Sequence, residues 1–318
     1  MNTVSLKPAD LVEICALTDN YSDLFLSDTE HVKRMRVLPP GAPMAEPGLS
    51  YLVRVVSGET SHTVLFDAGI TADCLLHNAR MLGSSRALMT EEIGVSLADV
   101  EAVVLSHGHF DHFGGLAGFL SQSRGQMPVH LHPGAFVNRR FSRRSMQVPM
   151  PGLNASALTE AGASLQPHKG GHTIASGLIL VSGEIERITG FEKGMPGMEA
   201  EIDGQWMADP FHDDQAMAVC VKDKGLVVLG GCSHAGIINT VRYLRKITGV
   251  EAVHAVLGGF HLSGDNEAVI EPTVSEMKVL APDWVVPMHC TGWNAINRFS
   301  REMPDAFLLN SVGATYVF

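Results

Sequence analysis

Three histidines and one aspartate lie close together in the segment SHGHFDH, residues 106–112, directly after the apolar run EAVVL. The candidate ligands are His107, His109, Asp111 and His112. His107 and His109 are two residues apart, so on extended backbone their side chains point to the same side. Asp111 and His112 are adjacent, and a turn into a helix would direct them to a second point. Imidazole and carboxylate groups suit Zn, Mn or Fe, so the segment predicts two neighbouring metal sites.

Each metal needs further ligands, and the last third of the chain offers histidines at the ends of expected strands. Three consecutive strand–helix units end their strands in turns that carry His234, His261 and His289. Ligands gather at the carboxyl ends of strands in α/β proteins, so we expect these turns to share one edge with residues 106–112. A structural zinc site is usually closed by four ligands with thiolates among them. The surplus of histidines favours a catalytic site instead.

The elements that must position these residues follow an α/β pattern. We expect strands in LVEICALTDN, LSYLVRVVSG and SHTVLFDAGI, and a helix in CLLHNARMLG. The last third alternates strands such as GLVVLGG with helices such as IINTVRYLRKITG. Residues 133–215 are rich in Gly, Pro and Met and show weak periodicity. We interpret the chain as one domain, residues 1–318, with a loop-rich, cap-like insertion at about 133–215.

Composition limits the classes of protein. The 318 residues are 45% hydrophobic and 6% aromatic with 32 glycines, which is typical of an α/β protein with many tight turns. The formal charge of −11 argues against nucleic acid as a partner. Five cysteines without C-x-x-C spacing favour a reducing compartment. No signal peptide or membrane-spanning run is visible, so we expect a cytoplasmic protein without a membrane partner. Nothing in the sequence specifies an oligomeric state.

The motif H-x-H-x-D-H after an apolar strand resembles the metallo-β-lactamase superfamily, and FDAG at 66–69 resembles that family's first motif. The segments AEPGLSYLV, SHGHFDHFGGL, GCSHAGIIN, GGFHL and PMHCTGW resemble one branch of it. That branch contains the 7,8-dihydropterin-6-methyl-4-(β-D-ribofuranosyl)aminobenzene-5′-phosphate synthases and related metal-dependent hydrolases. The resemblance covers about residues 10–318 and is weakest in the middle. It implies an α/β fold, a four-layer αβ/βα sandwich of two mixed sheets with the metals at one edge.

The resemblance also implies roles for single residues. Asp67 would support the metal-binding loop without binding a metal itself. His289 would be the last ligand, on the metal held by Asp111 and His112. His261 matches the branch, and we interpret it as a ligand, a proton donor to a leaving group, or a residue that merely caps its turn.

One position departs from the superfamily's pattern. A metal-bridging Asp often follows Gly at a strand end, whereas this chain has Gly231-Cys232, with His234 two residues further on. Either Cys232 replaces the carboxylate as a softer ligand, or His234 reaches the first metal and the carboxylate is absent. A buried, inert thiol is the remaining alternative for Cys232.

Several weaker candidates lie in the middle of the chain. Asp213 and Asp214 resemble the branch's acidic strand start and would either support ligands or form a solvated turn. His172, in GGHTIASG, superficially resembles the superfamily's usual third histidine motif, although a solvated histidine is the simpler interpretation. Four arginines would either bind a phosphate or form a solvated basic face: Arg139, Arg140, Arg143 and Arg144.

Taken together, these residues predict an enzyme that binds two divalent metals. Zinc is the leading candidate, and Mn, Fe or Mg are alternatives. Its expected substrate is a small anionic molecule that carries phosphate or diphosphate, and Asp111 and His261 are the expected catalytic residues. The resemblance implies that the reaction is hydrolysis, or a dihydropterin-type synthesis that transfers an alkyl group with loss of diphosphate. Alternatives are a hydrolase of a carboxylic ester or lactone and a non-catalytic metal- or ligand-binding protein. The charge argues against an RNA-processing nuclease, and a diiron oxygen reductase would prefer Glu at position 109.

Overall fold

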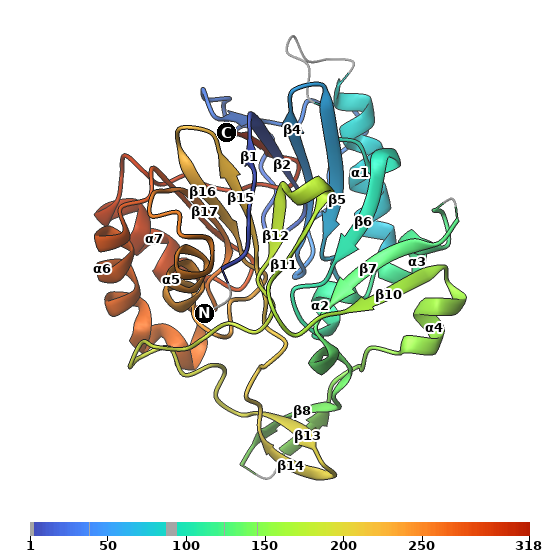
Figure 1. Ribbon diagram of the computed structural model, residues 1–318, viewed down its shortest axis with the longest axis vertical. Helices are drawn as coiled ribbons and strands as arrows, with labels where there is room; N and C mark the ends of the chain where they lie inside the picture. Colours follow the sequence, from blue (N-terminus) through green and yellow to red (C-terminus); the bar gives the residue numbers. More distant parts are fainter. Residues whose placement is uncertain (1–2, 38, 87–93, 124, 145) are drawn as a thin grey trace.

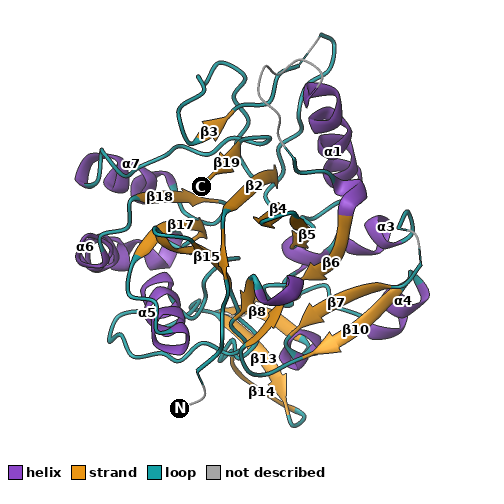
Figure 2. Cartoon of the chain, turned by 45° about the horizontal axis from the view of Figure 1, so that its top comes forward, coloured by secondary structure: helices purple, strands orange, loops and turns teal. Residues whose placement is uncertain are grey.

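The structure is a computed structural model that describes residues 3–37, 39–86, 94–123, 125–144 and 146–318. Two large β-sheets, which we call sheets I and II, pack face to face, and helices cover the outer face of each (Figures 1 and 2). A smaller sheet III extends beyond them at one end (Figure 1). This layering follows from strands that are apolar on both sides, because each of their faces needs a covering layer.

Sheet I is mixed. In spatial order its described strands are β10 (Ala163–Pro167), β7 (Met127–Leu131), β6 (Val100–Val104), β5 (Thr60–Phe66), β4 (Ser50–Ser57), β2 (Leu11–Thr18), β19 (Thr315–Val317) and β3 (Val32–Lys33). β5 and β6 are parallel neighbours, so the segments that follow them leave from the same edge of the sheet. The helical segments on this half are α1 (Ala72–Arg86), α2 (Phe110–Phe113), α3 (Leu116–Leu120), α4 (Ala155–Glu160) and the short 3-10 turns Leu97–Asp99 and Pro133–Phe136.

Sheet II contains the strands of the last third of the chain. Its described strands are β11 (His172–Ile174), β12 (Ile179–Val181), β15 (Met217–Val221), β16 (Gly225–Leu229), β17 (Val253–Gly259) and β18 (Trp284–Met288) in that order, with β1 (Pro8–Ala9) beside β15. β16, β17 and β18 are parallel, so their carboxyl ends share one edge. The helical segments on this half are α5 (Ile237–Thr248), α6 (Ile270–Leu280), α7 (Trp293–Glu302) and the 3-10 turns Ala175–Gly177 and Gly264–Val269.

Three apolar cores hold these layers together. The core between the sheets includes Tyr51 and Phe66 of sheet I and Leu229 of sheet II, all fully buried. A second core lies between sheet I and α1 and α3, and a third lies between sheet II and α5, α6 and α7. None of the helices that the structure describes is long and apolar enough to cross a membrane.

Residues 133–215, expected as one cap-like insertion, are in fact divided among all three sheets. Sheet III consists of β14 (Gln205–Ala208), β13 (Met198–Ile202), β8 (Arg139–Arg143) and β9 (Met146–Pro149). The other strands of this segment, β10, β11 and β12, belong to the two large sheets. The part that extends from the sandwich is therefore narrower than expected, and its arginine-rich segment forms a strand rather than a loop or helix.

Candidate metal centre

The segment 106–112 leaves the end of β6 and enters the short helix α2, which begins at Phe110. His107, His109 and His112 are buried. Gly108 is required because another strand connection passes close to it: a Cβ at this position would lie 2.1 Å from the carbonyl oxygen of Ala135. Glycine is therefore needed here for a close approach of backbone to backbone.

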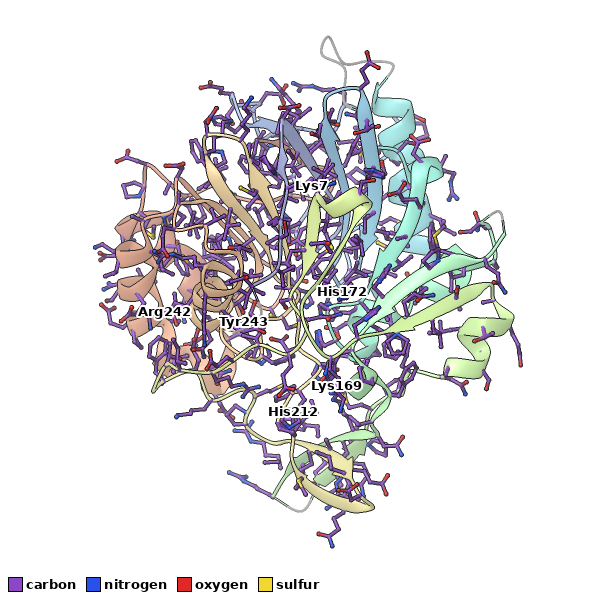
Figure 3. The ribbon with its side chains drawn as sticks, in the orientation of Figure 1. Lys7, Lys169, His172, His212, Arg242 and Tyr243 are labelled. Atoms are coloured by element: carbon purple, nitrogen blue, oxygen red, sulfur yellow. The ribbon has the colours of Figure 1, made fainter. Side chains whose placement is uncertain are left out.

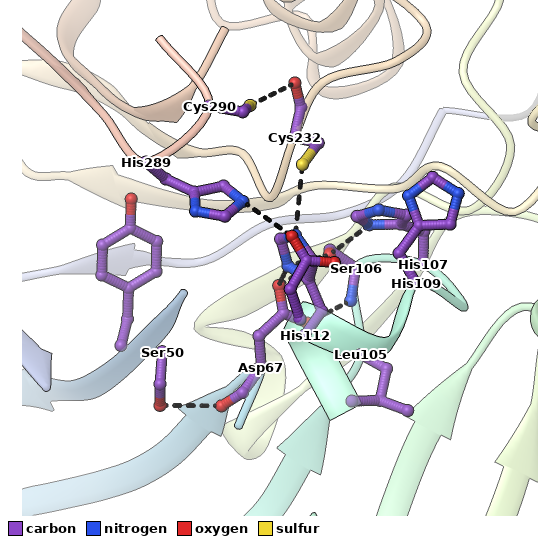
Figure 4. A network of polar contacts seen from close by, with 12 residues as sticks. Ser50, Asp67, Leu105, Ser106, His107, His109, His112, Cys232, His289 and Cys290 are labelled. Atoms are coloured by element: carbon purple, nitrogen blue, oxygen red, sulfur yellow. Dashed lines mark hydrogen bonds and ion pairs between the residues drawn. The ribbon is translucent and has the colours of Figure 1, made fainter. Parts of the chain in front are cut away.

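Asp67, at the end of β5, holds His112 in a fixed orientation. Its Oδ2 accepts hydrogen bonds from His112 Nδ1 at 2.6 Å and from Ser106 Oγ at 2.6 Å, and its Oδ1 accepts the Ser106 backbone N–H at 2.7 Å (Figure 4). Nε2 of His112 is thereby directed towards Cys232 Sγ, 3.1 Å away. Burial opposes a charge on His112, but the carboxylates of Asp67 and Asp111 outweigh it and raise the pKa of His112 to about 9.

One group of candidate ligands gathers around this histidine. The ligand atoms of Asp111, His112, Cys232 and His289 all lie within 4.8 Å of one another. Oδ2 of Asp111 is 3.4 Å from Nε2 of His289 and 3.8 Å from Nε2 of His112. The structure thus brings together the three residues that the sequence analysis assigned to one metal, and it adds the thiol of Cys232.

His289 is held by residues that the sequence analysis did not identify. Its backbone N–H donates to Asp19 Oδ1 at 2.9 Å, and its carbonyl oxygen accepts from Asn20 Nδ2 at 2.7 Å. Oδ2 of Asp19 accepts from Asn310 Nδ2 at 2.7 Å, so each oxygen of the carboxylate accepts a hydrogen bond. The only sequence signal was the pair Asp19-Asn20 at the end of an expected strand.

A second group of candidate ligands lies beside the first and shares Cys232 with it. The ligand atoms of His107, Cys232 and His234 lie within 4.8 Å of one another. His109 is adjacent, because its Nδ1 is 3.2 Å from Nε2 of His234. Phe211 stacks on the His234 ring at a centroid distance of 4.3 Å and excludes water from that side. Cys232 therefore occupies the position between the two groups.

The chemistry of these side chains fits divalent metals. Among the described residues, several buried ring nitrogens have no hydrogen-bond partner: His107 Nε2, His109 Nε2, His234 Nδ1, and Nδ1 and Nε2 of His289. An unsatisfied buried polar atom costs about 1–3 kcal/mol, and a bound metal would satisfy the ring nitrogens that face it. Burial lowers the pKa of His109 to about 3 and holds the pKa values of His107 and His234 well below the usual value. These imidazoles are neutral at pH 7, which is the form that binds a metal.

The strand ends that deliver these residues are strained. Asp67, Ser233, His261 and His289 have φ values of 59°, 56°, 49° and 54°, in the left-handed region that residues with a Cβ rarely adopt. Such a conformation costs of the order of 1–3 kcal/mol per residue and persists only where the surrounding structure imposes it. Strain concentrated at four strand ends around one cluster is typical of a functional site.

His261 lies next to both groups. Its ring centroid is 4.6 Å from that of His234, and its Nδ1 is buried without a hydrogen-bond partner among the described residues. Burial opposes a proton on this ring, but the sulfur of Cys290 outweighs it, so the pKa of His261 is raised. A cavity of about 150 Å³ opens beside His234 and His261. The roles expected for His261, as ligand, proton donor or cap of its turn, stay predictions.

Asp213 and Asp214 contact the backbone of the two ligand-bearing turns. Oδ2 of Asp213 accepts the Gly108 N–H at 2.8 Å, and Oδ2 of Asp214 accepts the Ala235 N–H at 2.8 Å. Burial raises the pKa of Asp214 to about 7. A solvated turn, the simpler expectation for this pair, is wrong, since both residues are about 1% exposed.

Arg139 also helps to hold these ligand-bearing turns in place, through its contact with Asp213. Its Nη2 donates to Asp213 Oδ1 and its Nε donates to Asp209 Oδ2, at 2.5 and 2.6 Å, and the side chain is buried. The expectation that Arg139 binds a phosphate is wrong, because two carboxylates already occupy its guanidinium group.

The other three arginines of the cluster lie in sheet III and its hairpin turn. Arg140 donates to Glu199 at 2.6 Å and covers the Trp206 ring at 4.2 Å. Arg143 lies 3.5 Å from Asp265, and Arg144 is exposed. A phosphate contact by Arg140, Arg143 or Arg144 stays a prediction. His172, the weaker candidate for the third histidine motif, lies outside the metal centre and in contact with His130. His234 lies within the centre, next to His109.

The fold and the arrangement of these histidines define a protein class. The sequence profile of the metallo-beta-lactamase superfamily matches residues 44–289, and the chain belongs to this superfamily. It is 30% identical over 274 residues to the 7,8-dihydropterin-6-methyl-4-(beta-D-ribofuranosyl)-aminobenzene-5'-phosphate synthase of Methanocaldococcus jannaschii. The aligned region covers 83% of this chain and 87% of the relative.

Two solved structures agree with this assignment. Tm1679, a metal-dependent hydrolase of the β-lactamase superfamily, superposes with a TM-score of 0.69 at 26% identity, over 96% of this chain and 98% of its own. Zn²⁺-bound PqqB from Methylobacterium extorquens shares the fold, with a TM-score of 0.50 at 11% identity over 95% and 99% of the two chains. The expected fold and superfamily are confirmed, and the chain is a metal-dependent enzyme of this superfamily.

Proposed function

We propose that this enzyme binds two divalent metals, with zinc as the leading candidate, and acts on a small molecule that carries phosphate or diphosphate. The position of Cys232 supports two adjacent metals most directly, because its Sγ belongs to both groups of candidate ligands. The proposed ligands of the first metal are His107, His109 and His234, those of the second are Asp111, His112 and His289, and Cys232 lies between them. Bound metals would supply positive charge for phosphoryl oxygens and lower the pKa of water.

Two residues of the chain, His261 and Asp111, would act on protons beside the metals. His261 faces the cavity that adjoins His234, and its raised pKa favours the protonated form, so it would protonate the leaving group. The charges of His112 and His289 outweigh burial and hold the pKa of Asp111 well below its usual value. Asp111 therefore stays ionised and would both bind a metal and orient the proton of the attacking group.

A second cavity, of about 310 Å³, favours a substrate with a flat ring. It lies beside His289, and its lining includes Tyr21, Met288, Ile296 and Trp293. The Trp293 side chain is 72% exposed, which is unusual for such a large apolar group and leaves its ring available for stacking. A heterocycle held here would place an attached phosphate or diphosphate next to His289.

Similarity to the dihydropterin synthase supports one form of the reaction. A dihydropterin-6-methyl diphosphate would lose diphosphate as its methylene carbon–oxygen bond breaks. The methylene carbon would bond to a ribofuranosyl-aminobenzene phosphate, with release of one proton. In the hydrolytic form, water would be the nucleophile instead, and the same residues would stabilise the anionic leaving group.

Product analysis by mass spectrometry tests the proposal and separates the two forms. The zinc-loaded protein is incubated with the dihydropterin diphosphate, with and without the aminobenzene phosphate, and with a panel of phosphodiesters. Diphosphate release that needs the second substrate indicates a synthase, and release with water alone indicates a hydrolase. Turnover should disappear in Asp111→Asn. Bound metal without turnover on any of these compounds would overturn the proposed substrate class.

A further inference from the structure

Three histidines outside the metal centre lie together where the two large sheets meet. His130 lies in β7, His168 directly follows β10, and His172 begins β11. One ring nitrogen of each lies within 4.8 Å of the others. β7 and β10 form one edge of sheet I, whereas β11 is an edge strand of sheet II. The cluster therefore connects the edges of the two sheets, and Figure 3 shows His172 near this seam.

The distances in this cluster match those of a metal site. Nε2 of His172 lies 3.3 Å from Nδ1 of His130. With Zn–N bonds of about 2.0–2.1 Å, two ligands of a tetrahedral zinc lie roughly 3.3–3.4 Å apart. The His168 ring lies tilted against that of His172 at a centroid distance of 4.0 Å and is partly exposed, so it can adjust to complete the site.

The second nitrogen of His172 fixes its orientation. Nδ1 lies 3.3 Å from the carbonyl oxygen of Gly170, to which it can donate as N–H. Histidines that bind metals usually donate their other ring N–H to a carbonyl or carboxylate in this way. In that tautomer the lone pair of Nε2 points towards His130 and is available to a metal.

The charges around the cluster favour a metal over a proton. Burial, with His172 and His168 nearby, lowers the pKa of His130 to about 4, and burial also lowers the pKa of His172. Within the described part of the chain, the strongest influences on these two rings include no carboxylate. The rings are therefore neutral at pH 7, as metal binding requires.

We propose that His130, His168 and His172 form a separate site for a divalent transition metal of the zinc type, with a coordination position open to solvent. Three imidazole nitrogens suit Zn²⁺, Cu²⁺ and Ni²⁺. The metal would join both ends of the segment 168–172, which connects the two sheets, to the neighbouring strand β7. Lys169 of this segment lines a cavity of about 450 Å³ together with Arg139 and Asp213, which support the main metal centre. Metal binding at the cluster would thereby fix Lys169 beside that cavity.

Zinc titration of metal-stripped protein, in competition with a chromophoric chelator, tests this site. The wild type is expected to bind one more equivalent than His168→Ala and one more than His172→Gln. His168 is chosen because its partial exposure makes misfolding of the variant least expected, and circular dichroism of the metal-free proteins verifies the fold. His62→Ala is the matched control, since His62 pairs with Glu101 away from the cluster, and it should bind as many equivalents as the wild type.

The same titration keeps the two metal proposals apart. Zinc equivalents lost in His109→Ala belong to the main metal centre, whereas zinc equivalents lost in His168→Ala belong to the cluster of His130, His168 and His172. Equal numbers of equivalents in wild type, His168→Ala and His172→Gln would overturn the proposed site. Equal loss in His62→Ala would also overturn it, because binding would then be unspecific.

Discussion

The sulfur of Cys232 lies 3.1 Å from Nε2 of His112, in the place where the superfamily often has a bridging carboxylate. The same sulfur also lies within 4.8 Å of a ring nitrogen of His107 and of His234. The two groups of histidines thus meet at a thiol, which binds soft metals well once it loses its proton. Burial raises the pKa of Cys232, so the metal itself would have to displace that proton.

Replacement of Cys232 by Ala should weaken binding at both metals. Because the thiol belongs to both groups, we expect the second equivalent to be lost and the first to bind at least about tenfold more weakly. Elemental analysis and chelator competition measure the two effects. Cys220→Ala is the control, since Cys220 is a free cysteine outside these groups. Unchanged zinc binding in Cys232→Ala would identify Cys232 as a buried, inert thiol.

Replacement of Asp67 by Asn should lower metal affinity by about 10- to 100-fold, although Asp67 is not a proposed ligand. The carboxylate fixes the Nδ1–H tautomer of His112, and loss of such outer contacts typically has an effect of this size. Competition titration gives the affinity. Asp73→Asn, at an exposed residue of α1, provides the control. Full affinity in Asp67→Asn would show that His112 is oriented by other contacts.

Zinc binding should release a proton from His112 at neutral pH. The pKa of His112 is raised to about 9 in the metal-free protein, and a metal at Nε2 requires the neutral ring. Below pH 9 the contribution of His112 to the affinity should therefore rise with pH, by up to about tenfold per unit, and level off above it. The thiol of Cys232 adds its own released proton and a pH dependence that continues to higher pH. Calorimetry in buffers of different ionisation enthalpy counts the protons. Binding without proton release at pH 7 would contradict the assignment.

Replacement of Arg139 by Ala should destabilise the fold strongly. Its guanidinium group is buried between Asp209 and Asp213, and removal of one partner from a buried ion pair costs about 3–5 kcal/mol. Arg143→Ala, at an exposed position of the same strand, should change the free energy of unfolding by less than about 0.5 kcal/mol. Urea unfolding of the metal-free proteins compares the two. Similar stabilities would mean that Arg139 is not a structural ion-pair residue.

The sequence was sufficient to predict the edge at which the candidate ligands gather. The spacing of His107 and His109 predicts that their side chains point to the same side of the chain. The alternation of strands and helices predicts that His234 and His289 lie at the same sheet edge as residues 106–112. These predictions depend on local periodicity and on the topology of parallel strands, both of which can be read along the chain.

Contacts between distant segments could not be predicted in the same way. Asp19 supports His289 across 270 positions of sequence, and Arg139 joins the segment at Gly108 to Asp213. Sheet III was missed because its strands β9 and β14 are exposed throughout and carry no apolar alternation. The cluster that contains His130 and His172 depends on which sheet edges meet, and periodicity does not reveal that.

Anomalous diffraction at the zinc edge, on crystals of the zinc-loaded protein, would locate the bound metals relative to Cys232. We expect two peaks about 3.5–4 Å apart, one beside His107 and His234 and the other beside Asp111 and His289, with Cys232 Sγ between them. A single peak in this centre, or two peaks without contact to Cys232, would contradict it.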